Sequence, residues 1–177
     1  MSRPPLAYLA ASVVMLAGLA GLIRGAVPQS AAAPSPSSSS GGGIVVGGAY
    51  VRQPANGINA AAYFTVYNTS GQADQLQSVQ AGAGAQTMLH QDEPNGTMKA
   101  LPAGVTVPAH GKVVLTPGKL HVMIEQLYGP LKPGQSVNLE LSFAHAGTVL
   151  VVAPVIAILA PAPTGAAAPT PSATVSK

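Results

Sequence analysis

The chain has 177 residues, of which only 7% are charged and none is cysteine. The absence of Cys excludes disulfide bonds and metal sites built from thiolates. The formal net charge is +3, but Arg3, Arg24 and Lys177 lie outside the part that has a globular pattern, and the acidic and basic residues between positions 44 and 156 balance. A neutral domain gives no support for a nucleic-acid-binding surface.

The N-terminal residues 1–28 contain an uninterrupted run of apolar and small residues from Leu6 to Ile23. This run is slightly shorter than the roughly 20 residues that a bilayer-spanning helix needs. We therefore expect a hydrophobic helix that is either a cleaved signal peptide or a retained membrane anchor. Both alternatives place the protein outside the cytoplasm, in the periplasm or at the cell surface. Without Cys, a lipid anchor attached to a cysteine is excluded.

Two flanking segments have the composition of disordered chain. Residues 29–43, QSAAAPSPSSSSGGG, are rich in Ser, Pro and Gly, and residues 157–177 are rich in Ala, Pro and Thr. Such segments have too little apolar surface to offset the entropy of folding. We predict a linker over 29–43, a folded domain over 44–156 and a disordered tail over 157–177.

The predicted domain consists of short β-type runs separated by turn residues. The runs cover residues 44–52, 60–68, 74–80, 86–90, 105–109, 112–117, 120–127, 136–144 and 147–155. Gly or Pro stands in each of the breaks NTSG, EPNG, AHG, PGK, YGPLKPGQ and HAG, as is typical of turns. No stretch shows a sustained helical period. The pattern predicts an all-β domain, a Greek-key β-barrel or sandwich.

The run LHVMIEQL, residues 120–127, is apolar on one side only. Successive side chains of a strand point to opposite faces. Leu120, Val122 and Ile124 are therefore expected to face the core, with His121 and Met123 on the other side.

Histidine and methionine recur in two pairs of the same kind. Met88 and His90 are two residues apart in TMLHQ, His121 and Met123 are two residues apart in LHVMI, and Met98 lies between the two pairs. Thioether and imidazole are soft, neutral donors of the kind that Cu(I) prefers, whereas zinc favours thiolate or His with carboxylate. The pairs predict a Cu(I) site with Glu125 as the acid beside it. A plainer interpretation is that each Met fills a gap in packing.

A longer set of segments resembles a known family. AYVRQP (49–54), AAAYFTVYNTSGQADQL (60–76), the region of His90, and TPGKLHVMIEQLYGPLKPGQSVNLELSF (116–143) are similar to the PCu(A)C periplasmic copper chaperones. PGKLHVM followed by LYGPLKPG is the most specific element. The resemblance implies a cupredoxin-like fold that binds Cu(I) at an exposed site. It also implies delivery of copper to respiratory oxidase, through a copper-accepting subunit or an assembly factor.

The resemblance also assigns ligands. His90, His121 and Met123 match the family's two histidines and one methionine. The family has a further Met roughly eleven residues after the first His, where this chain has Ala100 and Leu101, but an offset of two keeps a residue on the same face of a strand. We expect Met98 to be the fourth ligand, with Met88 as the alternative.

Two other classes of function are alternatives to copper transport. A metal-free exported β-sandwich, used for adhesion or as a scaffold, would explain the export segment and the strands but not the paired His and Met. An enzyme is not expected, because the five acidic residues form no recognisable pair or triad and no His cluster is present for redox catalysis.

Overall fold

The structure is a computed structural model, and it describes residues 39–163. The expected N-terminal helix and the greater part of the expected linker and tail lie outside these residues. Within residues 39–163 no helix is long and apolar enough to cross a membrane. The described part is all-β, as predicted.

The described residues form eleven strands in chain order. They are β1 (Ser39–Gly41), β2 (Ile44–Arg52), β3 (Ala60–Asn68), β4 (Asp74–Ala81), β5 (Gly84–Asp92), β6 (Met98–Ala100), β7 (Val105–Val107), β8 (Lys112–Val114), β9 (Leu120–Leu127), β10 (Ser136–Phe143) and β11 (Gly147–Ile156). β2, β3 and β9 have the predicted bounds. β6 was not predicted, and β1 lies inside the segment 29–43 that we expected to be linker.

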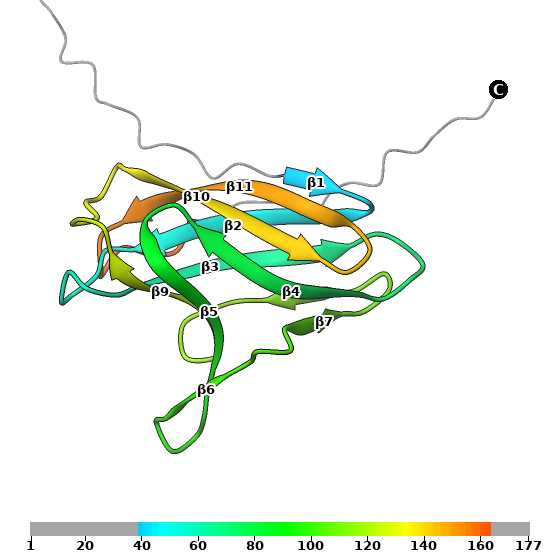
Figure 1. The fold of residues 1–177 in the computed structure, drawn as a ribbon, viewed down its shortest axis with the longest axis horizontal. Coiled ribbons are helices and arrows are strands. Elements are labelled where there is room, and N and C mark those ends of the chain that lie inside the picture. The colour runs from blue at the N-terminus through cyan, green and yellow to red at the C-terminus, as the bar shows by residue number, and fades with distance from the viewer. Residues whose placement is uncertain (1–38, 164–177) are drawn as a thin grey trace, which may run out of the picture. The chain divides into compact units, whose positions relative to one another are not determined.

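The strands join one curled sheet, which Figure 1 shows wrapping around its concave side. The order is β6-β5-β9-β3-β2-β11-β10-β4-β7, with β1 paired to β2 and β8 paired to β3. β11 runs parallel to β2, and the remaining pairs are antiparallel. The sheet therefore brings β5 and β9, which are distant in the sequence, side by side.

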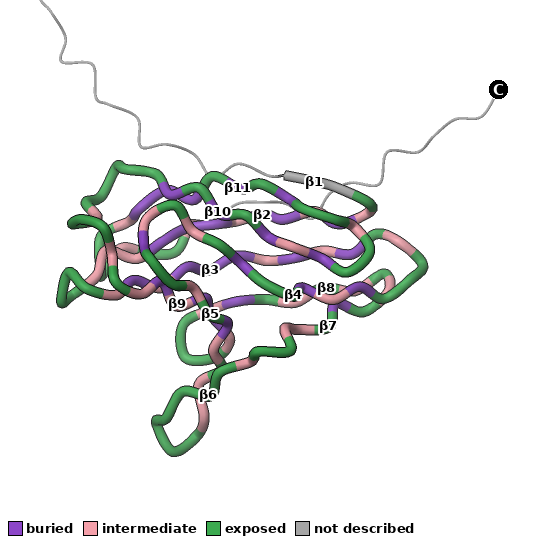
Figure 2. Tube along the Cα trace, viewed as in Figure 1, coloured by how far each residue is buried: buried purple, intermediate pink, exposed green. Residues whose placement is uncertain are grey.

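The core follows the two-residue alternation of the strands. On β10 the side chains of Val137, Leu139, Leu141 and Phe143 are buried, while Ser136 and Asn138 are exposed. Buried and exposed residues also alternate along the first part of β11, whereas β2 and β3 carry only buried and intermediate residues (Figure 2). Each fully buried aliphatic or aromatic side chain contributes about 1.5–3 kcal/mol, so this shared core holds the strands in register.

The turn between β10 and β11 is tied to β4 by one buried carboxylate. Asp74 accepts hydrogen bonds from the backbone N–H groups of Gln75 (2.7 Å), His145 (2.9 Å) and Ala146 (2.9 Å). The Nδ1 atom of the exposed His145 ring lies 3.3 Å from the same carboxylate. Burial raises the pKa of the Asp74 carboxyl, but the hydrogen bonds from His145, Gln75 and Ala146 outweigh it and lower the pKa. His145 thus belongs to this contact.

Candidate metal centre

The register of β5 against β9 places the two predicted histidine ligands directly opposite each other. His90 pairs with His121, and their ring centroids are 5.9 Å apart with the planes at 74°. Directly opposite residues of antiparallel strands point to the same face of the sheet. The two imidazoles, 31 residues apart in the sequence, are therefore neighbours.

The next row of the same face carries two methionines. Met88 pairs with Met123 across the same two strands, and both lie one step of two residues from the histidines. Met88 is 43% exposed, whereas Met123 is partly buried. A cross-strand pair and its diagonal neighbours lie within about 8 Å between backbones. The two pairs found in the sequence thus form one compact patch.

Met98 lies on β6, which pairs with the edge of β5 that is away from β9. β6 pairs with β5 so that Ala100 is opposite His90 and Met98 is opposite Asp92. Met98 therefore points to the face of the histidines, as the offset of two predicted, and it is 52% exposed. Met88 and Met98 flank the histidine row on its two sides, and both lie one row away from it.

His121 is more enclosed than the alternation of β9 suggested. Its side chain points away from Val122 and Ile124, as expected, but it is only 4% exposed. The Tyr63 ring lies 6.4 Å from the His121 ring between centroids, and an oxygen of Asp92 lies 3.7 Å from His121 Nδ1. The His121 ring thus lies between the Tyr63 ring and the Asp92 carboxylate.

The acid nearest the histidines is Asp92, which the sequence did not single out, and Glu125 lies on the same face at the other end of the patch. Glu125 pairs with Gln86, one row beyond the methionines. Asp92 follows His90 by two residues on β5. The alternation that places Met88 and His90 on one face also places Asp92 there, but the predicted strand ended at His90.

His90 carries the one buried side-chain N or O atom in residues 39–163 that has no hydrogen-bond partner, namely Nδ1. A buried polar atom without a partner costs about 1–3 kcal/mol. A metal ion coordinated by Nδ1 itself would give this atom a partner. This observation fits His90 as a ligand.

A tyrosine pair and an arginine extend the same face beyond His121. Tyr50 pairs with Tyr63, with ring centroids 5.1 Å apart, and burial raises the pKa of both phenols. The Arg52 guanidinium lies 5.8 Å from the Tyr50 ring centroid. Its Nη1 donates hydrogen bonds to the backbone oxygens of Ile158 (2.5 Å) and Ala160 (3.1 Å). This part of the face is aromatic and cationic, and it offers no anionic donor.

The donors define what kind of ion the patch can hold. Among residues 39–163 no group of three or more His, Cys, Asp or Glu is arranged to bind a metal. The other soft donors beside His90 and His121 are the thioethers of Met88, Met123 and Met98. This soft donor set is the kind that Cu(I) prefers.

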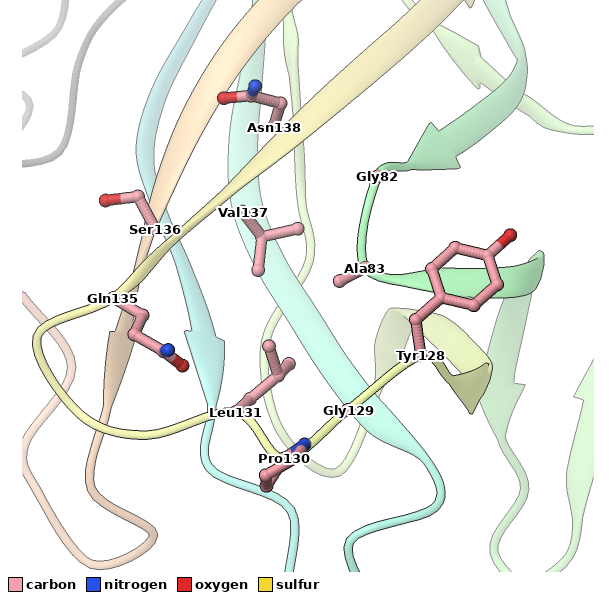
Figure 3. A pocket seen from close by; sticks show the side chains of 10 residues that line it. All are labelled: Gly82, Ala83, Tyr128, Gly129, Pro130, Leu131, Gln135, Ser136, Val137 and Asn138. Carbon is pink, nitrogen blue, oxygen red and sulfur yellow. The ribbon is translucent and has the colours of Figure 1, made fainter.

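A separate groove lies away from these residues. It has a volume of about 630 Å³ and runs between the turn after β4, the loop after β9 and the first residues of β10 (Figure 3). Tyr128, Pro130 and Leu131 of the LYGPLKPG segment line it. It adjoins the Gly84–Leu127 end of the β5–β9 pair, six residues along β5 from His90, which corresponds to about 20 Å. The groove is not part of the metal centre.

The fold is that of PCuAC domains. The apo PCuAC domain from PmoF1 is similar with a TM-score of 0.61 and 28% identity, over 68% of this chain and 99% of that one. The copper-bound PCuAC domain from PmoF2 gives a TM-score of 0.60 at 22% identity, over 68% and 98%. The Cu(I) form of DR1885 from Deinococcus radiodurans gives 0.52 at 32% identity, over 62% and 75%. The resemblance seen in the sequence is confirmed.

Residues 44–155 match the family model described as "Putative lipoprotein LpqE-like", and the chain belongs to this family. It is also 31% identical to "Putative lipoprotein Lxx21020" of Leifsonia xyli subsp. xyli (strain CTCB07), over 77% of this chain and 83% of that protein. Both names describe putative lipoproteins. The present sequence contains no Cys.

Proposed function

We propose that the protein is an extracytoplasmic copper chaperone that carries one Cu(I) ion and does not act as an enzyme. One observation carries the proposal: the register of β5 and β9 brings His90 opposite His121 and Met88 opposite Met123 on a single face. The solved PCuAC domains that share the fold include a copper-bound form and a Cu(I) form. The donors of this chain are of the type that suits the same ion.

The ligands are His90, His121 and Met123, with Met98 as the fourth and Met88 as its alternative. Both candidate methionines are exposed, whereas His121 is buried. This difference suits a carrier, because the exposed thioether can be exchanged for a donor of the recipient while the imidazole still holds the ion. Transfer by stepwise ligand exchange follows from this arrangement.

The recipient in this proposal is a copper centre of respiratory oxidase, reached through a copper-accepting subunit or an assembly factor. Export by the N-terminal segment, with or without retention as an anchor, would place the domain on the correct side of the membrane. The relatives named as lipoproteins support an envelope location. If the segment is retained, a flexible linker of about 15 residues would give the domain a reach on the order of 20 Å.

The test is competition between the protein and a chromophoric Cu(I) chelator under anaerobic, reducing conditions. We expect the wild type to take one equivalent of Cu(I) and His121→Ala combined with Met123→Ala to lose it. His110→Asn is the matched control, because it removes a histidine outside the site at a turn residue with φ of 51°, a conformation that Asn tolerates. Because protons compete with the metal for imidazole nitrogen, acidification should release the ion.

If the wild type binds no Cu(I), the remaining candidate is a metal-free exported β domain used for adhesion or as a scaffold. If the double variant binds as tightly as the wild type, copper is bound elsewhere and the ligands are wrong. Equal weakening in His110→Asn would show that the loss is not specific to the site.

A further inference from the structure

We propose that Asp92 is a positioning residue for His121, which fixes the tautomer of the ring and supplies the negative charge that the ligand set lacks. The part that concerns charge rests on the proposed copper binding. The statement about the tautomer applies to the metal-free protein and does not depend on copper binding.

The geometry begins with the side chains around His121. An oxygen of Asp92 is 3.7 Å from Nδ1 of His121, and the exposed fractions of the two side chains are 30% and 6%. Tyr63 lies on the β3 side of the ring and His90 on the β5 side. Among residues 39–163 no Lys or Arg forms an ion pair with Asp92. His121 is therefore the one basic side chain in this part of the chain within 4.0 Å of the carboxylate.

A carboxylate near one ring nitrogen decides where a neutral imidazole carries its proton. A proton on Nδ1 faces the negative charge favourably, whereas a lone pair there would be repelled by it. The separation of 3.7 Å exceeds ordinary hydrogen-bond length, so the effect acts through the field of the carboxylate. With Nδ1 protonated, Nε2 keeps its lone pair for a metal ion, in the way that metal-binding histidines are usually held.

The second histidine of the pair has no such partner. His90 Nδ1 is buried and makes no hydrogen bond. The two imidazoles of one cross-strand pair therefore differ, with His121 set in one tautomer before the metal arrives and His90 free of that constraint.

The charge of Asp92 matters because every proposed ligand is neutral. Two imidazoles and two thioethers leave the single positive charge of Cu(I) uncompensated. Asp92 lies in the row next to His90 and His121 and opposite Met98. Its partly buried charge offsets that of the ion, which Glu125, one row beyond the methionines, is less well placed to do.

The experiment measures the tautomer and the affinity in the same variants. Long-range ¹⁵N–¹H correlation spectra of the metal-free full chain, recorded in alkaline buffer where imidazole is neutral, report which nitrogen of His121 carries the proton. We expect the Nδ1–H form in the wild type, and a loss of this preference in Asp92→Asn. Glu93→Gln is the matched control, since it removes the neighbouring acid, which follows the last residue of β5 and forms no salt bridge with His121.

Competition with the Cu(I) chelator provides the second readout. Removing an outer carboxylate from a metal-binding histidine lowers affinity by about 10–100-fold, and we expect a loss in this range for Asp92→Asn with little change for Glu93→Gln. An Nε2–H tautomer in the wild type would overturn the proposal, as would an Asp92→Asn variant no different from Glu93→Gln in both measurements. If the wild type binds no Cu(I), the proposed function fails, whereas the tautomer still decides the role of Asp92. Should Asp92→Asn fail to fold, the wild-type spectrum alone decides it.

Discussion

Replacement of Asp74 by Asn should destabilise the fold by about 2.5–7 kcal/mol at neutral pH. The carboxylate accepts three backbone N–H groups, two at Oδ1 and one at Oδ2. An amide of the same shape has only one oxygen, so its best orientation keeps the bonds from Gln75 and His145 and turns an NH₂ group toward the N–H of Ala146. Hydrogen bonds to a charged group contribute about 1.5–3 kcal/mol, and neutral ones about 1 kcal/mol. One lost bond and two weakened bonds give the stated range.

The loss should depend on pH in a defined direction. The pKa of Asp74 in the folded chain is lowered from the ordinary value of 3.8. A lowered pKa means that the ionised carboxyl is more stable in the folded than in the unfolded protein. Its contribution is therefore complete above pH 3.8 and disappears as the pH falls below that value through the folded pKa. The difference between wild type and Asp74→Asn should shrink over the same interval.

Urea unfolding followed by circular dichroism, at neutral pH and at several pH values below 3.8, measures both effects. Glu140→Gln removes an exposed acid from β10 and serves as the control, with a change within about 0.5 kcal/mol. A difference between wild type and Asp74→Asn that stayed constant down to the lowest pH would refute the reasoning, because the charge of Asp74 would then contribute nothing.

Two further outcomes can be measured directly. Met98→Leu should weaken Cu(I) binding in the chelator competition more than Met88→Leu, and the reverse order would make Met88 the fourth ligand. Gly104→Ala should lower the free energy of unfolding, measured with urea, by well over about 1 kcal/mol. The reason is that φ is +78° and a Cβ atom would lie 2.1 Å from the backbone oxygen of Leu76. An unchanged urea midpoint would show that this loop shifts freely.

Most strands could be predicted because their faces alternate. β10 alternates between apolar and polar residues along its whole length, and β9 keeps Leu120, Val122 and Ile124 on one side; β9 has the predicted bounds and β10 ends one residue early. β6 could not be found in this way, since its three residues, Met98, Lys99 and Ala100, are all exposed and leave no apolar pattern. It is a strand because it pairs with β5, and no pattern within its own three residues indicates that pairing.

The site could be predicted only in part. The spacing of Met88 with His90, and of His121 with Met123, showed which side chains share a face within each strand. That the two strands are neighbours in matched register is a property of the sheet, and only the resemblance to a family suggested it in advance. The enclosure of His121 by Tyr63 comes from a third strand, so no local pattern indicated it.

The hairpin of β5 and β6 also explains why the distance in sequence between a histidine and a methionine is a poor guide to coordination. Met98 follows His90 by eight residues, and the turn that joins their strands is closed by a hydrogen bond from the Glu93 N–H to the Thr97 carbonyl. Residues added to that turn would lengthen the interval without altering which residues face each other across the strands. A homologous chain with a turn about three residues longer could thus carry its methionine at the same point in space with a spacing of roughly eleven. Pairing across the sheet is the property that such homologues would have to share.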